Sequence, residues 1–152
     1  MQNFERGLLI DLHGHGHSHQ IQEIGYLLDG HALKQSHEYL KSNTHKSSIY
    51  SLSKKYDIID LMIGENSIGT LLEKSGYPSV PSHHNPAPSG SYFNGGYTVL
   101  THGSKNGGSI DAIQVEVSSN IRKQMHGHNM LDFSHALADS ISSFHSHYYR
   151  ST

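Results

Sequence analysis

The segment Leu8-Leu-Ile-Asp-Leu-His-Gly-His-Gly-His-Ser-His19 begins as an apolar run and ends with a histidine at every second position. Its apolar part, within residues 7–12, predicts a buried β-strand that leads into a loop rich in His and Gly. On an extended chain, side chains two residues apart point the same way, so up to four imidazoles could share one face. Glycine also permits sharp turns, which would instead place the rings around a point. We expect the chemistry of the protein here, because imidazole is a common metal ligand that titrates near neutrality.

Length and composition predict one domain with a modest core. The chain has 152 residues, of which 34% are hydrophobic, and it contains 15 glycines. This length suits a single domain, and the low hydrophobic content predicts long polar loops. The formal net charge is −2 with histidines neutral, and no run of Lys or Arg exceeds two residues. Nucleic acid is therefore not an expected partner.

The absence of cysteine from the sequence excludes disulfides and cysteine-ligated zinc. No segment approaches the roughly 18 apolar residues of a membrane span, and the apolar stretch near the N-terminus is too short for a signal peptide. We therefore expect a cytoplasmic protein that has no membrane partner.

Hydrophobic patterning predicts the remaining strands and loops. Residues 20–30 indicate a strand or strand-loop, and residues 31–46 an exposed polar connection that could include a helical turn. Residues 77–91 contain all four prolines and predict a long loop of the kind that is usually functional. Two strands are expected at residues 96–102 and 110–117, joined by a turn with three glycines.

Helices are expected at residues 48–56 and 66–74, and Gly76 is placed to stop the second of them. The clearest helix is the last one, where apolar residues recur every three or four positions. Asp132 or Ser134 is expected to cap its start. The apolar stripe consists of Phe133, Leu137, Ile141, Phe144 and Tyr148.

Glu116 lies within the β-branched run Ile113-Gln-Val-Glu-Val117. Burying a carboxylate costs several kcal/mol unless it is paired, hydrogen-bonded or close to a metal. One interpretation is that Glu116 is a general base that activates a metal-bound water. The alternative is an edge strand from which Glu116 faces solvent.

His13 is the leading candidate metal ligand. Asp11 precedes it by two residues, and a carboxylate that holds the second ring nitrogen is a usual device at metal sites. His15, His17 and His19 are either further ligands or surplus histidines of a solvated loop.

Outside this segment, Arg122 could clamp a carboxylate bidentately or form a surface ion pair. His126 and His128 predict either a second metal site or a polar turn. Histidines in the proline loop and at the end of the 96–102 segment are candidate pocket residues, whereas those on the last helix are expected to be exposed. The first group is His83, His84 and His102, and the second is His135, His145 and His147.

A series of short motifs runs in order over nearly the whole chain. They are Leu8 to His17, Glu23-Ile-Gly-Tyr-Leu-Leu28, Asn66-Ser-Ile-Gly69, Tyr77-Pro-Ser-Val-Pro-Ser82, Tyr92-Phe-Asn-Gly-Gly-Tyr-Thr98, His102-Gly-Ser104, Ile110 to Val117 and Ser119-Asn-Ile-Arg122. As a set they resemble the N-formylglutamate amidohydrolase-like family. The resemblance implies an α/β fold similar to that of zinc carboxypeptidases, with a mixed central sheet flanked by helices.

The resemblance also implies a zinc-dependent amide hydrolase that acts on a small N-acyl amino acid or peptide. By the same resemblance, His13 corresponds to the zinc ligand of an Asp-x-His motif and Glu116 to the catalytic glutamate. Arg122 corresponds to a residue that binds the substrate carboxylate, with His102 as a second candidate for substrate binding.

We expect residues 1–152 to be a single domain that corresponds to the C-terminal half of that family. The family's Pro-His-Gly type motif, which supplies a zinc ligand, has no counterpart in the sequence. Catalytic zinc ordinarily has three protein ligands and a water, so His13 requires local partners from among His15, His17 and His19. Otherwise a second subunit supplies ligands, or catalysis is lost.

Loss of catalysis would leave a non-catalytic, histidine-rich protein that binds metal, responds to pH or assembles. A sheet that lacks its other half exposes strand edges and apolar surface, so we also expect a homo-oligomer.

Overall fold

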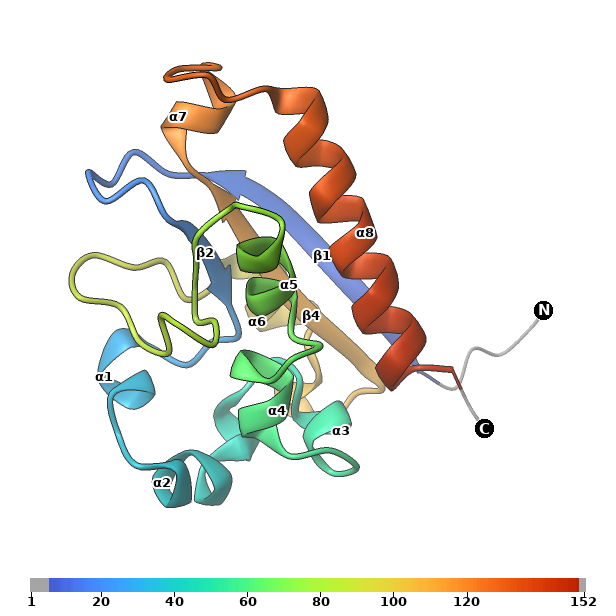
Figure 1. The fold of residues 1–152 in the computed structure, drawn as a ribbon. Helices are drawn as coiled ribbons and strands as arrows, with labels where there is room; N and C mark the ends of the chain where they lie inside the picture. Colours follow the sequence, from blue (N-terminus) through green and yellow to red (C-terminus); the bar gives the residue numbers. More distant parts are fainter. Residues whose placement is uncertain (1–5, 151–152) are drawn as a thin grey trace.

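In the computed structural model, which describes residues 6–150, the chain forms a four-stranded mixed β-sheet flanked by helices (Figure 1). The strand order is β1-β4-β2-β3. Strand β1 runs parallel to β4, whereas β2 runs antiparallel to β4 and parallel to β3. The expected α/β class with a mixed sheet is confirmed. The strands are β1 (Gly7–Gly14), β2 (Gln22–Gly25), β3 (Ser79–Val80) and β4 (Ile110–Val117).

The helices are short except for the last, which has 19 residues. Among residues 6–150, no helix combines the length and the apolar character that crossing a lipid bilayer requires. The α-helices are α1 (Gly30–Leu33), α2 (His37–Ser42), α3 (Tyr50–Ser53), α4 (Ile58–Ile63), α5 (Ile68–Lys74), α6 (Tyr97–His102), α7 (Ser119–Arg122) and α8 (Met130–Tyr148). Two 3₁₀ turns, η1 (Thr44–Lys46) and η2 (Ser104–Asn106), complete the set.

One face of the sheet belongs to the hydrophobic core. Ile24, Ile113 and Val115 are fully buried there, and Val115 pairs with Ile24 across β2 and β4. Helix α8 lies beside β1 and β4 and packs on α5 (Figure 1). Four of the five residues of its predicted stripe are buried, which confirms the amphipathic pattern. Burying apolar area of this kind is the main favourable term in folding.

The opposite face of the sheet is polar near the carboxyl end of β4. Strand pairing places His13 beside Glu116 and Glu116 beside Glu23, so one row of three side chains crosses three strands. Helix α6 contacts β4 and β1, and the loop before α6 approaches Gly25 so closely that a Cβ there would lie 2.6 Å from Asn94 backbone atoms. The polar row is therefore covered by a loop at one end.

The prediction of a strand at residues 96–102 is wrong. This segment forms helix α6 and is not the hairpin partner of β4. Both edges of β4 are already paired, to β1 and to β2, so a further strand has no place beside it. The β-propensity of Tyr-Thr-Val reports packing on a sheet more than a backbone preference, and tertiary context overrides it here.

The 110–117 strand, the short helix within 48–56 and the helix within 66–74 are confirmed. Gly76 follows that last helix with φ +90°, as expected for a helix stop. Strand β1 is confirmed as a strand but is not buried. It lies at the sheet edge, where Leu12 is 60% exposed. The cap of α8 is Asn129, which accepts from Leu131 N–H and Asp132 N–H, and not Asp132 or Ser134.

Candidate metal centre

Three imidazoles of the histidine loop converge on one carboxylate, that of Glu23. From Glu23 Oε1, His17 Nδ1 lies at 2.5 Å, His19 Nε2 at 3.1 Å and His15 Nδ1 at 3.8 Å. The three ring centroids are 5.1–5.6 Å apart. The loop closes through Gln20, whose φ of +56° reverses the chain before β2. The rings are therefore arranged around a point and do not line an extended strand.

Glu23 is fully buried, and its position follows from strand pairing. It lies on β2 directly opposite Glu116 of β4. Its second oxygen, Oε2, accepts a hydrogen bond from the Phe93 N–H at 2.7 Å. The loop that covers the polar row thus also holds the carboxylate, which leaves Oε1 directed at the histidines.

The hydrogen bonds of two histidines determine which ring nitrogen has a lone pair. His15 Nε2 donates to the Ile21 carbonyl at 2.7 Å, and its Nδ1 accepts from the His17 N–H at 3.1 Å. His19 Nε2 donates to the Ser91 carbonyl, and its Nδ1 accepts from the Ile21 N–H, each at 3.1 Å. Burial lowers the pKa of His15, against the opposing effect of Glu23. His15 is therefore favoured as neutral imidazole, the form that binds metal.

His15, His17 and Glu23 could hold a metal ion, because one ligand atom from each lies within 4.8 Å of the others. Two imidazoles and a carboxylate form a donor set typical of zinc and related divalent transition metals. His15 and Glu23 are buried, and His17 is partly exposed. Two of the three predicted metal ligands, His15 and His17, are thus brought together.

Glu116 lies next to this cluster and is 5% exposed. Burial raises the pKa of Glu116, and Glu23 adds to this effect, while the hydrogen bond from Gln114 and the nearby His13 oppose it. Among the described residues, none donates a hydrogen bond to its buried Oε2 atom. A raised pKa of this kind, caused by burial, is a feature that general acid–base residues share.

The third predicted ligand, His13, is not part of the cluster. Its side chain is 49% exposed, and Nε2 lies 3.1 Å from Asp11 Oδ2. The predicted Asp-His pairing is present, but it lies on the edge strand beside Glu116.

The predicted substrate-binding residues are not among the three potential ligands. Arg122 braces the backbone: Nε donates to the Val117 carbonyl at 3.1 Å and Nη2 to the His15 carbonyl at 2.8 Å. His102 is exposed at the last position of α6.

The other candidate histidines lie elsewhere. Within residues 6–150, His126 and His128 belong to no group of three potential ligands. His84 pairs with Glu73 at 2.9 Å in the proline loop. The histidines of α8, which were expected to be exposed, are exposed: His135, His145 and His147.

Sequence reasoning missed Glu23 as a site residue. The available signal was an acidic residue flanked by isoleucines in Ile21-Gln-Glu-Ile24, the segment that follows the histidine loop. The same argument that singles out Glu116, a carboxylate within a buried strand, applies to Glu23.

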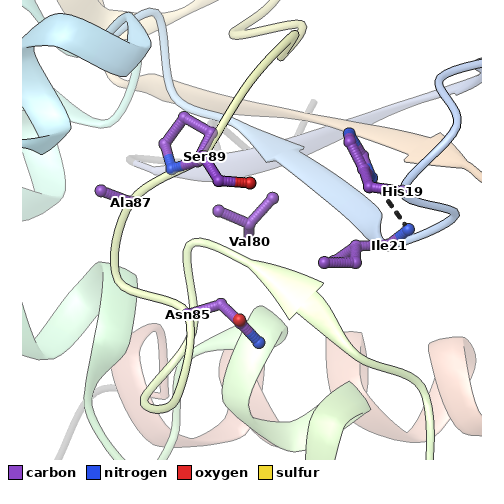
Figure 2. A pocket seen from close by; sticks show the side chains of 7 residues that line it. His19, Ile21, Val80, Asn85, Ala87 and Ser89 are labelled. Carbon is purple, nitrogen blue, oxygen red and sulfur yellow. Dashed lines mark hydrogen bonds between the residues drawn. The ribbon is translucent and has the colours of Figure 1, made fainter.

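A small pocket lies beside His19 (Figure 2). His19 and Ile21 come from the histidine loop, Val80 from β3, and the remaining side chains from the proline loop (Figure 2). Its lining contains no Lys, Arg, Asp or Glu, so it suits an uncharged group. The lining residues are His19, Ile21, Val80, Asn85, Ala87, Pro88 and Ser89.

Comparisons with known proteins found no relatives: no protein-family model, curated protein or solved structure matches the chain.

Proposed function

We propose that this protein binds one zinc or similar divalent transition-metal ion through His15, His17 and Glu23. The observation that carries the proposal is the convergence of two imidazoles on the buried Glu23 carboxylate, with one ligand atom from each within 4.8 Å of the others. A buried carboxylate is unfavourable without compensating charge, and a cation coordinated at Oε1 would supply it. His19 Nε2 lies 3.1 Å from the same oxygen, so His19 borders the site without being one of the three ligands.

We further propose that the site serves hydrolysis of an amide in a small N-acyl amino acid, as the resemblance to N-formylglutamate amidohydrolase-like proteins suggests. The protein would then share that family's zinc-carboxypeptidase-like fold. A bound metal of this kind polarises a carbonyl oxygen and lowers the pKa of water. Glu116 supports the proposal, because its carboxyl group is buried beside Glu23 and its raised pKa suits it to hold and release a proton.

The pocket beside His19 supports a proposal about which chemical groups the substrate carries. Its uncharged lining would accept a small acyl group or aliphatic side chain rather than a second carboxylate. Arg122 already donates to two backbone carbonyls through Nε and Nη2, so only its remaining guanidinium N–H groups could bind a substrate carboxylate.

A non-catalytic role is the second candidate function, and one observation favours it. In the described structure both ring nitrogens of His15 and of His19 already have hydrogen-bond partners. A cluster satisfied in this way could stabilise the loop without catalysis. Such a protein would bind metal or respond to pH and would turn over no substrate.

Metal content and turnover measured on the same samples separate these functions. Wild-type protein loaded with zinc and dialysed should retain one ion per chain by elemental analysis, and His17→Ala should retain none. His145→Ala, which removes an exposed histidine of α8, is the matched control and should bind as wild type does. A wild-type protein without metal would refute the metal proposal.

Hydrolysis is then measured as formate release from N-formylalanine and N-formylglutamate. The enzyme proposal expects turnover with zinc, its loss in Glu116→Gln with zinc content unchanged, and preference for the alanine compound. Bound zinc without turnover of either compound would remove the enzyme proposal and leave the non-catalytic one.

A further inference from the structure

Strand β1 ends the sheet, and its outer edge of eight residues pairs with no other strand among residues 6–150. Its inner edge bonds to β4, as the bonds from Gly7 N–H to Ser109 O and from His15 N–H to Val117 O show at either end. Odd-numbered residues therefore point their N–H groups at β4. Because a strand alternates, the N–H and C=O groups of Leu8, Ile10, Leu12 and Gly14 point outward.

Natural sheets usually protect such an edge with charge, proline or a bulge. Between Gly7 and Gly14 the only charged carboxylate is Asp11, and proline is absent. Leu12 is 60% exposed, and the neighbouring helix α6 exposes Tyr97 (81%) and Leu100 (45%). The edge is thus open to pairing and lies beside apolar surface.

We infer that β1 pairs antiparallel with β1 of a second copy of this chain, with Leu12 opposite the partner's Leu12 on the two-fold axis. Residues whose N–H and C=O groups point outward must lie opposite each other. Neighbouring allowed registers therefore differ by a shift of two residues, which is one step. With Leu12 on the axis, Asp11 lies opposite the partner's His13, and His13 opposite the partner's Asp11. These are non-hydrogen-bonded positions, where cross-strand side chains approach most closely.

Hydrogen-bonding complementarity selects this register over its neighbours, because it places each Asp11 carboxylate opposite an imidazole, which can donate an N–H. A shift by one step places Asp11 opposite the partner's Asp11, which is unfavourable for like charges. A shift the other way places His13 opposite the partner's His13. With Leu12 on the axis, two reciprocal carboxylate–imidazole contacts form, because Asp11 and His13 lie on the same face of β1, where Asp11 Oδ2 is 3.1 Å from His13 Nε2.

The dimer would join the two sheets into one continuous sheet with four strands from each copy. The row of Glu23, Glu116 and His13 would then continue onto the partner's Asp11. The pairing requires no metal, so its tests are done with chelator present and are independent of the metal proposal.

Cysteine cross-linking tests the register, and the absence of native cysteine makes the background clean. In the proposed register, Leu12→Cys places two thiols on a hydrogen-bonded pair with Cα atoms about 5.5 Å apart, which suits a disulfide. Oxidised glutathione should convert Leu12→Cys to a covalent dimer. Ile10→Cys, opposite the partner's Gly14, should stay monomeric on a non-reducing gel. A dimer from Ile10→Cys in place of Leu12→Cys would overturn the register.

Sedimentation velocity tests the pairing itself. At the upper end of a concentration series, the wild type should give a mass from sedimentation that is twice the 16.9 kDa mass of one chain. Leu12→Pro removes an outward N–H that β4 does not use, a change that edge strands tolerate. It should be monomeric with an unchanged circular dichroism spectrum. Monomeric wild type throughout the series, together with no cross-link at position 12, would refute the dimer even if the proline variant failed to fold.

Discussion

Glu23 and Glu116 are direct neighbours across the antiparallel pair β2–β4, and both carboxyl groups are buried on the same face of the sheet. Like charges in such a pair destabilise a sheet. Their surroundings differ: Glu23 contacts His17, His19 and the Phe93 N–H, whereas Glu116 contacts the Gln114 amide. Glu23 is therefore the carboxylate with hydrogen-bonding partners, and Glu116 is the carboxyl group that is suited to hold a proton.

Glu116→Gln should raise the free energy of unfolding at pH 8 by roughly 1–2 kcal/mol, because it removes an under-compensated buried carboxylate. Burial raises the pKa of Glu116 in the folded protein. The wild type therefore gains stability from Glu116 at low pH and loses it as pH rises from the ordinary glutamate pKa, about 4.3, through the raised value. Urea unfolding across this range, with chelator present, measures the difference.

In that experiment the advantage of Glu116→Gln should disappear below pH 4, where the wild-type carboxyl group is protonated in both states. An advantage that is constant with pH, or a destabilised variant, would contradict the account of this pair.

Arg122→Ala should destabilise the protein by about 1–3 kcal/mol, because the guanidinium donates charge-assisted hydrogen bonds to Val117 O and His15 O. It connects the end of β4 to the start of the histidine loop. Zinc affinity should also fall, since His15 would be less constrained. Thermal unfolding measures the stability, and Lys123→Ala, an exposed neighbour, is the control that should change little.

Gly14→Ala provides an independent check of the same Arg122 hydrogen bonds. A Cβ at Gly14 would lie 2.3 Å from Arg122 Nε, so the arginine must move. If Gly14→Ala is as stable as wild type, the hydrogen bonds of Arg122 to Val117 O and His15 O do not stabilise the protein as proposed.

Glu73→Gln should weaken the attachment of the proline loop to α5. The carboxylate accepts from Ser82 Oγ at 2.9 Å and from Asn85 Nδ2 at 3.1 Å, and it pairs with His84. Burial tends to raise the pKa of Glu73, but the hydrogen bonds from His84 and Ser82 outweigh it and the pKa is lowered. We expect a loss of about 1–2 kcal/mol in unfolding free energy at pH 7.

Because the folded pKa of Glu73 is lowered, its contribution is present above the ordinary glutamate pKa and is lost as pH falls through the folded value. The difference between wild type and Glu73→Gln should therefore shrink on acidification. Glu65→Gln removes an exposed ion pair with Lys74 and should have a much smaller effect. Equal effects of the two substitutions would show that Glu73 is not a specific anchor.

The strands and helices that carry strong local patterns were predictable from the sequence. Residues 110–117 form a strand with the predicted bounds, because β-branched residues alternate there. Residues 96–102 have similar composition, yet they form α6, since β1 and β2 occupy both edges of β4. Which strand pairs with which depends on contacts far apart in sequence, and local propensity does not contain that information.

The same limit applies to the candidate site. His15 and His17 were predicted because they follow an apolar strand. Glu23 was missed because its role depends on a reversal at Gln20 and on the pairing of β2 with β4. His13 precedes the reversal and stays on the edge strand, where it pairs with Glu116, so it is not among the imidazoles that converge on Glu23.

Calorimetric zinc titration of wild type and Glu23→Gln tests the central claim most directly, because the substitution keeps the shape of the side chain and removes its charge. The account predicts one ion per chain for wild type and an affinity at least about tenfold weaker for Glu23→Gln, in line with the scale of effects at metal sites. Equal zinc affinity in the two proteins, or no binding by wild type, would contradict the assignment of His15, His17 and Glu23 as a metal centre.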